Sequence, residues 1–202
     1  MGGTALNMPT DHYQPLAQFV AKHFKLSRPS LESFIAPWLP YNALRKEVLT
    51  AVDEEERYLY FIIDGVQRVY ALDSRGKEAT LVFTYAPSFG GVLDAMMTAQ
   101  KSKYVYEALT PSKLLRVPII EIKKLMNENS EIAQMINLGV SQALGGLLER
   151  LAELQLMSSE EKFRSLLTRS PHILTLVPHK YLASYLGIDA TNFSKLMNSV
   201  KI

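Results

Sequence analysis

FIIDGVQRVYALDSRGKEATLVF, residues 61–83, decides the fold class of this 202-residue chain. Runs of β-branched and aromatic residues at Tyr58–Ile63 and Val66–Leu72 flank the dipeptide Asp64-Gly65. An Asp-Gly pair between two such runs predicts a hairpin with a type I′ turn, because that turn needs a positive φ at both central residues. A third run, Ala79–Tyr85, follows after a turn at residues 73–76. The stretch therefore predicts consecutive antiparallel strands.

The same alternation of strand-forming runs and turn residues extends to both sides of this stretch. Further candidate strands are Glu47–Val52, Tyr104–Leu109 and Lys113–Val117. Short strands at regular spacing with tight turns are typical of antiparallel barrels and jelly rolls. Helical spacing marks the residues before them, with one helix through Leu16, Phe19, Val20 and Phe24 and another over Ser30–Ala36. We therefore expect a β-roll preceded by two helices.

A long helix is predicted from Ser130 to Gln155, after the last strand. Its apolar residues follow the spacing of a coiled-coil seam, and Leu144 and Leu148 form a second stripe beside it. A helix with two apolar stripes must be covered on more than one side, either wholly by its own domain or also by a second copy. We predict the second arrangement, while Gly145-Gly146 fits either close helix approach or a kink. The predicted dimer interface consists of Ile136, Val140, Ala143, Leu147, Leu151 and Leu154.

The C-terminal part has the spacing of a helix-turn-helix. Ser158 and Glu161 form a capping box that begins a helix. In HKYLASYLGIDATNFSKLM, residues 179–197, Gly187 takes the turn, where a positive φ is needed, and Asp189 is suited to cap the second helix. A tight helical hairpin of another kind has similar spacing, so the pattern is moderately specific.

In a helix-turn-helix the exposed face of the second helix enters the major groove of DNA. Asn pairs with adenine and Thr contacts the methyl group of thymine, while residues at the start of the first helix bind phosphate. The alternative is that these polar groups only solvate a surface helix. Residues 158–202 carry six basic and three acidic side chains, a weakly basic balance. The predicted DNA-binding residues are His179, Lys180, Thr191, Asn192, Ser194, Lys195 and Asn198, with Tyr181 beside the first two.

Composition excludes several classes of protein. The chain has no Cys, which excludes disulfides, thiolate metal sites, iron–sulfur clusters and cysteine nucleophiles. The four His are scattered, and residues 46–117 contain none, so a metal site or a metal-dependent enzyme on the roll is not expected. No apolar run is long enough to span a membrane, and the N-terminus lacks the build of a signal peptide. We expect a cytoplasmic protein that is not an enzyme and not bound to a membrane.

A β-roll, a long helix and a terminal helix-turn-helix, in this order, resemble Crp/Fnr-type transcription regulators, particularly a short form common in Bacteroidetes. The resemblance covers essentially the whole chain. It implies an α+β fold with an N-terminal antiparallel, jelly-roll-like β-roll, a long dimerisation helix and a C-terminal helix-turn-helix domain. The corresponding domains are residues 1–128, 129–157 and 158–202. The resemblance further implies a homodimer that binds palindromic double-stranded DNA, and it allows RNA polymerase as a partner.

Members that bind cyclic nucleotides carry Gly-Glu-Leu at the start of a short helix, then Arg-Ser or Arg-Thr about ten residues later. The Glu holds the ribose and the Arg neutralises the phosphate. Here Gly90-Gly91-Val92 replaces the first motif, so the Glu is missing. Ser102 and Lys103 stand where Arg-Ser would be, and Lys does not supply the bidentate contact of Arg. We therefore expect no response to cyclic AMP, and the sequence identifies no other effector and no cofactor. The expected effector pocket is Gly90, Gly91, Val92, Lys101, Ser102 and Lys103.

The second helix of the predicted helix-turn-helix also departs from the family pattern. Ala190-Thr191 replaces an Arg-Glu or Pro-Glu pair, and Lys195 replaces a later Arg. Two functions follow. The chain is a DNA-binding regulator of the Crp/Fnr type, or it is a ligand-sensing or protein-binding adaptor of the same fold that has lost specific DNA reading.

Overall fold

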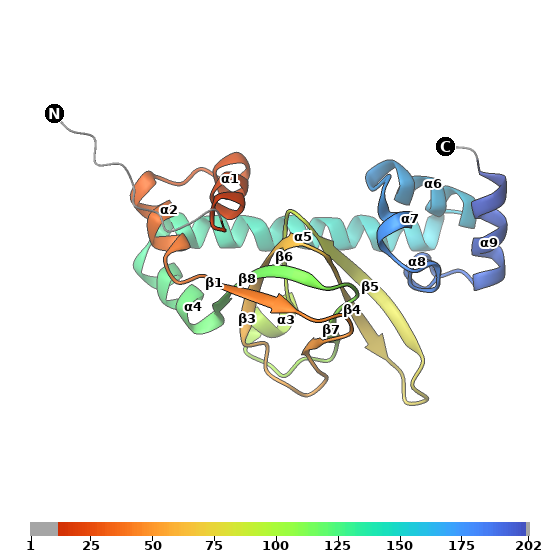
Figure 1. Ribbon diagram of the computed structural model, residues 1–202, viewed down its shortest axis with the longest axis horizontal. Helices are drawn as coiled ribbons and strands as arrows, with labels where there is room; N and C mark the ends of the chain where they lie inside the picture. The colour runs from red at the N-terminus through yellow and green to blue at the C-terminus, as the bar shows by residue number, and fades with distance from the viewer. Residues whose placement is uncertain (1–11, 201–202) are drawn as a thin grey trace.

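The computed structural model describes residues 12–200 (Figure 1). The helices α1 (Gln14–His23) and α2 (Arg28–Ile35) precede the strands. The strands are β1 (Leu39–Ala43), β2 (Val48–Thr50), β3 (Tyr58–Asp64), β4 (Val66–Leu72), β5 (Glu78–Tyr85), β6 (Ser88–Gly90), β7 (Val105–Ala108) and β8 (Ser112–Pro118), with α3 (Leu93–Thr98) between β6 and β7. The remaining helices are α4 (Ile119–Glu128), α5 (Ser130–Leu156), α6 (Ser159–Arg169), α7 (Ile173–Leu176), α8 (His179–Leu186) and α9 (Ala190–Ser199).

The strands form two four-stranded sheets, and all their pairings are antiparallel. The order is β1-β8-β3-β6 in one sheet and β2-β7-β4-β5 in the other. Together they form the roll seen in the middle of Figure 1, between the N-terminal helices and the C-terminal helices. The α+β class and the antiparallel roll are therefore confirmed.

The predicted hairpin at Asp64-Gly65 is wrong. Strands β3 and β4 belong to different sheets and do not pair, so the chain crosses at this point from one sheet to the other. Only Gly65 has a positive φ, of 95°, whereas a type I′ turn needs two such residues. A Cβ at Gly65 would overlap the side chain of Ser112, so this crossing requires glycine for space as well as for conformation.

The sequence also missed two edge strands. The roll begins with β1 at Leu39 rather than near Leu44, and β6 lies just before α3. Strand β1 contains Pro40, which is tolerated because β1 pairs on one side only, with β8. Strand β6 has three residues and pairs only with β3, too short a run to be recognised by pattern.

Apolar residues fill both faces of the sheet that contains β3. Leu59 and Phe61 join Leu16, Phe34 and Trp38 in a core between this sheet and the helices. The alternate residues of β3 point into the roll, where Tyr60 and Ile62 pack with Tyr106, Val69 and Leu114. Because β3 is buried on both faces, it appears in the sequence as a continuous apolar run.

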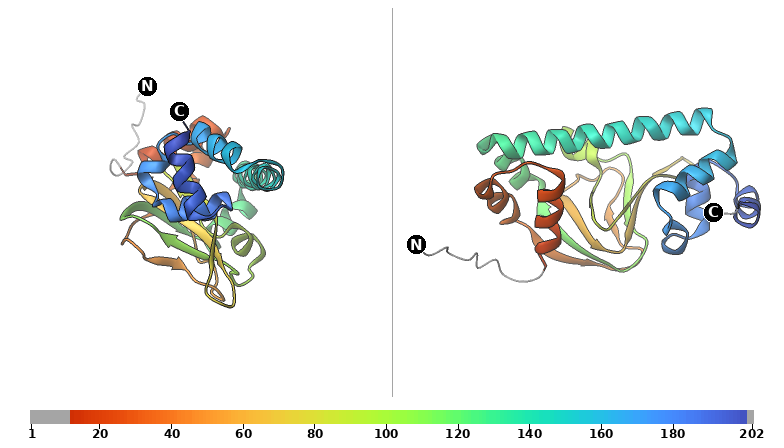
Figure 2. Two further views of the ribbon diagram at one scale, coloured as in Figure 1. Left: turned by 90° about the vertical axis from the view of Figure 1, so that its right-hand side faces the viewer. Right: turned by 90° about the horizontal axis from the view of Figure 1, so that it is seen from above.

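Helix α5 joins the two ends of the molecule (Figure 1). Its first turns are anchored by Ile132 and Met135 in the roll's core, and Arg150 near its other end is buried against α8. Seen from above in Figure 2, the helix runs along one side of the molecule. One side of its middle part is therefore left uncovered by the rest of the chain.

Candidate DNA-binding and effector sites

Helices α8 and α9 form the predicted helix-turn-helix. Gly187 ends α8 with a φ of 65°, and its amide donates to carbonyls of the last turn. The carboxylate of Asp189 accepts a hydrogen bond from the amide of Asn192 at 2.8 Å, which caps α9. The predicted turn and cap are confirmed, and so is the capping box of Ser158 and Glu161 at the start of α6.

One face of α9 is held by a small apolar core. Phe193 is buried against Phe163 of α6, with ring centroids 5.5 Å apart, and Leu196 lies beside it. The opposite face carries exposed polar side chains, namely Thr191, Ser194, Lys195 and Asn198. An exposed polar face on a helix that is fixed from behind is the arrangement that reads a DNA groove.

The other predicted DNA-binding residues differ in accessibility. Asn192 is half-buried, and its side-chain amide donates to the hydroxyl of Ser159 at 3.1 Å. His179 and Lys180 are exposed at the start of α8. Tyr181, expected to bind phosphate, is instead buried and faces the roll, so that expectation is wrong for this arrangement of the two units.

Tyr181 belongs to a contact between the roll and the helix-turn-helix that the sequence did not predict. Its hydroxyl pairs with Nζ of Lys46 at 2.5 Å, and the guanidinium of Arg68 lies 4.0 Å from its ring centroid. Arg68 is 1% exposed and forms ion pairs with Glu107 at 2.8 Å and Glu78 at 2.6 Å. A buried, fully paired guanidinium under an aromatic ring fixes α8 on the β4–β5 strands.

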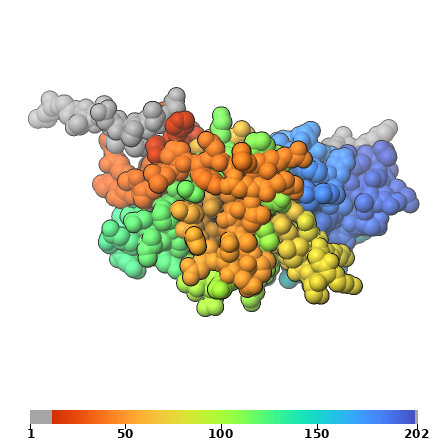
Figure 3. All heavy atoms as spheres, turned by 60° about the horizontal axis from the view of Figure 1, so that its bottom comes forward, coloured from red at the N-terminus to blue at the C-terminus, as the bar shows by residue number. Residues whose placement is uncertain are grey.

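Further contacts extend the same interface. The amide of Thr80 donates to the hydroxyl of Ser184 at 3.0 Å, and the rings of Phe83 and Tyr185 lie 5.1 Å apart. On the face shown in Figure 3, the C-terminal helices lie directly beside the strands of the roll.

The predicted dimer interface divides into two parts. Ile136 packs against the core of the roll, and Val140 is half-buried. From Ala143 onwards the stripe is exposed, and Leu147 is 47% exposed. Leu144, Leu148, Leu151 and Leu154 are exposed as well. So many leucines on one helix face form an apolar surface of the kind that proteins bury in an interface.

The glycine pair of α5 has open space around it. No heavy atom outside the helix lies within 4 Å of the position that a Cβ would take at Gly145 or Gly146. Close packing within the described chain is therefore not the reason for glycine at these positions.

The structure divides the residues of the predicted effector pocket into a buried set and an exposed set. Gly90 lies in β6, where a Cβ would overlap the hydroxyl of Tyr106, so the side chain of Tyr106 takes this space. Ser102 is buried, and its hydroxyl donates to the carbonyl of Tyr104 at 2.7 Å. Lys101 and Lys103 are exposed.

Glu56, which sequence reasoning missed, lies beside Val92 of the predicted effector pocket. Glu56 is 7% exposed, and its carboxylate accepts hydrogen bonds from the amide of Val92 at 2.7 Å and from the hydroxyl of Thr50 at 2.9 Å. Gly91, with a φ of 133°, lets the backbone pass close to this carboxylate. Burial raises the pKa of Glu56 from 4.5 to about 6.

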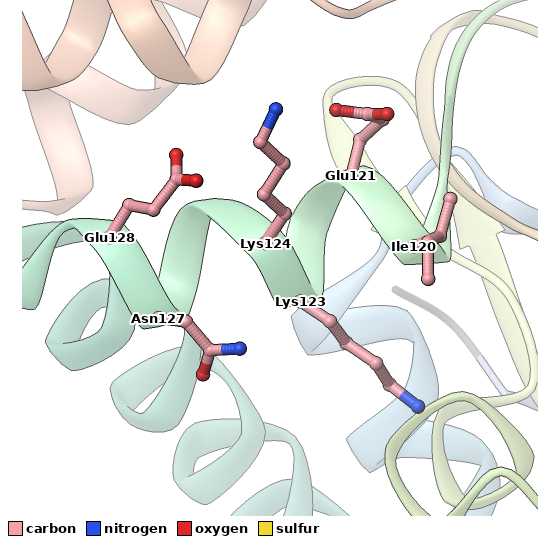
Figure 4. A pocket seen from close by; sticks show the side chains of 6 residues that line it. All are labelled: Ile120, Glu121, Lys123, Lys124, Asn127 and Glu128. Atoms are coloured by element: carbon pink, nitrogen blue, oxygen red, sulfur yellow. The ribbon is translucent and has the colours of Figure 1, made fainter.

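The surface has two depressions near α4. The first, of about 380 Å³, is lined by α4 alone, and Figure 4 shows Lys123 and Asn127 on one side of this helix and Glu121 and Lys124 on the other. Residues of a single helix that diverge in this way do not surround a ligand. The second, of about 280 Å³, lies between α3, α4 and the start of α5, and its apolar lining includes Met96, Met97, Met126 and Ile136.

Within residues 12–200 no group of three or more acidic or His residues is placed to hold a metal ion. In the same part of the chain no helix is long and apolar enough to cross a lipid bilayer.

Residues 42–129 match the cyclic nucleotide-binding domain family. The chain is 25% identical to the global nitrogen regulator of a Nostoc species over 169 residues, covering 77% of this chain and 75% of that protein. Its fold resembles FixK2 from Bradyrhizobium japonicum, with a TM-score of 0.73 at 16% identity over 80% of this chain and 83% of that one. A transcriptional regulator of the Crp/Fnr family from Eubacterium rectale is similar over 93% of this chain and 87% of its own, with a TM-score of 0.69 at 16% identity.

The relatives that carry a functional description are regulators and not enzymes. The matched domain, the order of the elements and the helix-turn-helix of α8 and α9 agree with one another. Residues 42–129 therefore match a cyclic nucleotide-binding domain, and the chain as a whole is similar in sequence to global nitrogen regulators and in fold to transcription regulators of the Crp/Fnr family.

Proposed function

We propose that the chain forms a homodimer that binds palindromic double-stranded DNA in the cytoplasm and regulates transcription there. In this proposal residues 1–128 form the effector-type domain, 129–157 the dimerisation helix and 158–202 the DNA-binding domain. The observation that carries it is the exposed polar face of α9, held from behind by Phe193 and Leu196. RNA polymerase is the further partner we propose for a regulator bound near a promoter.

The dimer is proposed to form through the exposed stripe of α5. Helices paired along Leu147 and Leu151 would bury leucines that are now about half exposed. Two copies related by a twofold axis place their recognition helices about one DNA turn apart, ~34 Å, which is the reason a palindrome is expected. Lys195, Thr191 and Asn198 would contact the DNA, and His179 and Lys180 would approach phosphates.

A second candidate function has its own support. Helix α9 carries no Arg, the residue that most often reads guanine, and the side chain of Asn192 is engaged with Ser159. Both observations favour an adaptor of the same fold that no longer reads a DNA sequence.

One experiment separates the two functions. Genomic DNA fragments are pulled down with the purified protein at low and at physiological salt and then sequenced. A palindrome that stays enriched at physiological salt supports the regulator. Binding at low salt without a common motif reflects attraction to phosphate alone and supports the adaptor.

A further inference from the structure

Glu56 connects two segments of the roll that are distant in sequence. It follows β2 and bonds to the amide of Val92, directly before α3. Backbone hydrogen bonds join the same segments, since the amide of Asp53 donates to Ser102 and the amide of Ser102 donates to Glu54. The segment around α3 is thus fastened at both ends by the residues around Glu56.

The carboxylate of Glu56 has no cationic partner among the described residues, and its bonds are to neutral donors. The ionised carboxylate acts electrostatically on the phenols of Tyr60 and Tyr106, whose pKa values are raised mainly by burial. Glu56 therefore introduces an unneutralised negative charge into the roll when it is ionised. An anionic ligand entering here would meet a like charge.

Side chains of the chain itself fill the rest of this space. The ring of Tyr106 packs against Gly90 and lies 5.7 Å from the ring of Tyr60. Its hydroxyl lies 3.0 Å from the hydroxyl of Thr84, which bonds to Gln67. The interior is thereby packed and hydrogen-bonded by the protein alone.

Contacts within the chain also fix the elements on either side of the roll, from α3 to the helix-turn-helix. Met96 of α3 is buried with Ile122 and Ile132 in the core that anchors the start of α5. On the other side of the roll, Arg68 and Tyr181 hold α8. The position of the helix-turn-helix is therefore determined by contacts within the chain at both places.

We infer that Glu56 takes the place of an effector in this chain, so that the roll and the helix-turn-helix adopt their DNA-binding arrangement without a small molecule. This inference rests on the proposed function and specifies its regulation. It assigns to Glu56 the ordering of α3 and the exclusion of anionic ligands, cyclic nucleotides among them.

The test uses the full chain, freed of small molecules by gel filtration and checked by native mass spectrometry. Its affinity for the palindrome from the pull-down is measured by fluorescence anisotropy, alone, with millimolar cyclic AMP and with the small-molecule fraction of a cell extract. We expect changes of less than about twofold on each addition. Glu56→Ala, which removes both hydrogen bonds, should lower the affinity at least about tenfold, whereas Glu55→Ala, at the exposed neighbour, should leave it unchanged.

A gain of about tenfold or more on adding either small-molecule sample would overturn the inference. Hydrogen exchange of residues 92–98 decides the case if Glu56→Ala misfolds or the wild type binds no DNA. Protected amides in the ligand-free wild type support the ordering of α3 without a small molecule, and rapid exchange there contradicts it. Absence of DNA binding together with protected amides would refute the proposed function and leave the role of Glu56 in α3 intact.

Discussion

Raising the pH is expected to destabilise the folded chain through one group, Glu56. Its pKa rises from 4.5 to about 6 on folding, mainly because burial disfavours the charged form. Between these two values the folded state binds more protons than the unfolded state. The stabilisation is therefore complete below the ordinary pKa of 4.5 and is lost as the pH rises through about 6. This difference between the two pKa values corresponds to about 2 kcal/mol in the free energy of unfolding. About 1.2 kcal/mol of it is lost between about pH 5 and about pH 7.5.

Glu56→Gln isolates this contribution because its amide is neutral at every pH. Its oxygen can still accept from Val92, and its nitrogen can donate to Thr50. The assay is urea unfolding of the wild type and the variant across this pH range, with Glu55→Gln as the exposed control. The stability of the wild type relative to Glu56→Gln should fall by about 1 kcal/mol as the pH rises. A difference between the two proteins that is independent of pH would refute the assignment of a buried, uncompensated carboxylate.

Three further predictions concern the helices. Leu147→Glu should convert the dimer to a monomer in sedimentation equilibrium. Leu138→Glu should not, because Leu138, equally exposed at 48%, lies nine residues away on the opposite side of α5. An unchanged mass for Leu147→Glu would contradict the predicted dimer interface. Lys195→Ala should weaken DNA binding and reduce the slope of log affinity against log salt by about one, and an unchanged slope would place Lys195 away from the DNA. Asp189→Ala should lower the stability of the helix-turn-helix by about 1 kcal/mol in thermal unfolding, because the bond to the amide of Asn192 is lost, whereas Asp189→Asn should retain most of it.

Local signals in the sequence predicted the C-terminal helices well. The capping box at Ser158, the glycine turn at Gly187 and the cap at Asp189 depend on neighbouring residues only. The central strands and the long helix were also predictable, because hydrophobic spacing reflects burial within each element, whereas β1, β6 and α4 were not predicted.

Features that depend on distant segments were not predictable. Asp64-Gly65 has the composition of a hairpin, yet the sheet in which each flanking strand pairs is decided by β8 and β7. Arg68 lies on the outer face of β4 and is buried only because α8 packs there. Glu56 is the one buried member of the acidic run 53–56, and nothing in the run distinguishes it from its exposed neighbours.

In the proposed complex, two copies of the chain, joined through α5, read two DNA half-sites. A nuclease footprint of the wild type and of Leu147→Glu on the palindrome recovered from genomic DNA tests it most directly. The wild type should protect both half-sites, centred about one helical turn apart, and Leu147→Glu should lose this joint protection at the same protein concentration. Protection of a single half-site by the wild type, or equal footprints for the two proteins, would contradict it.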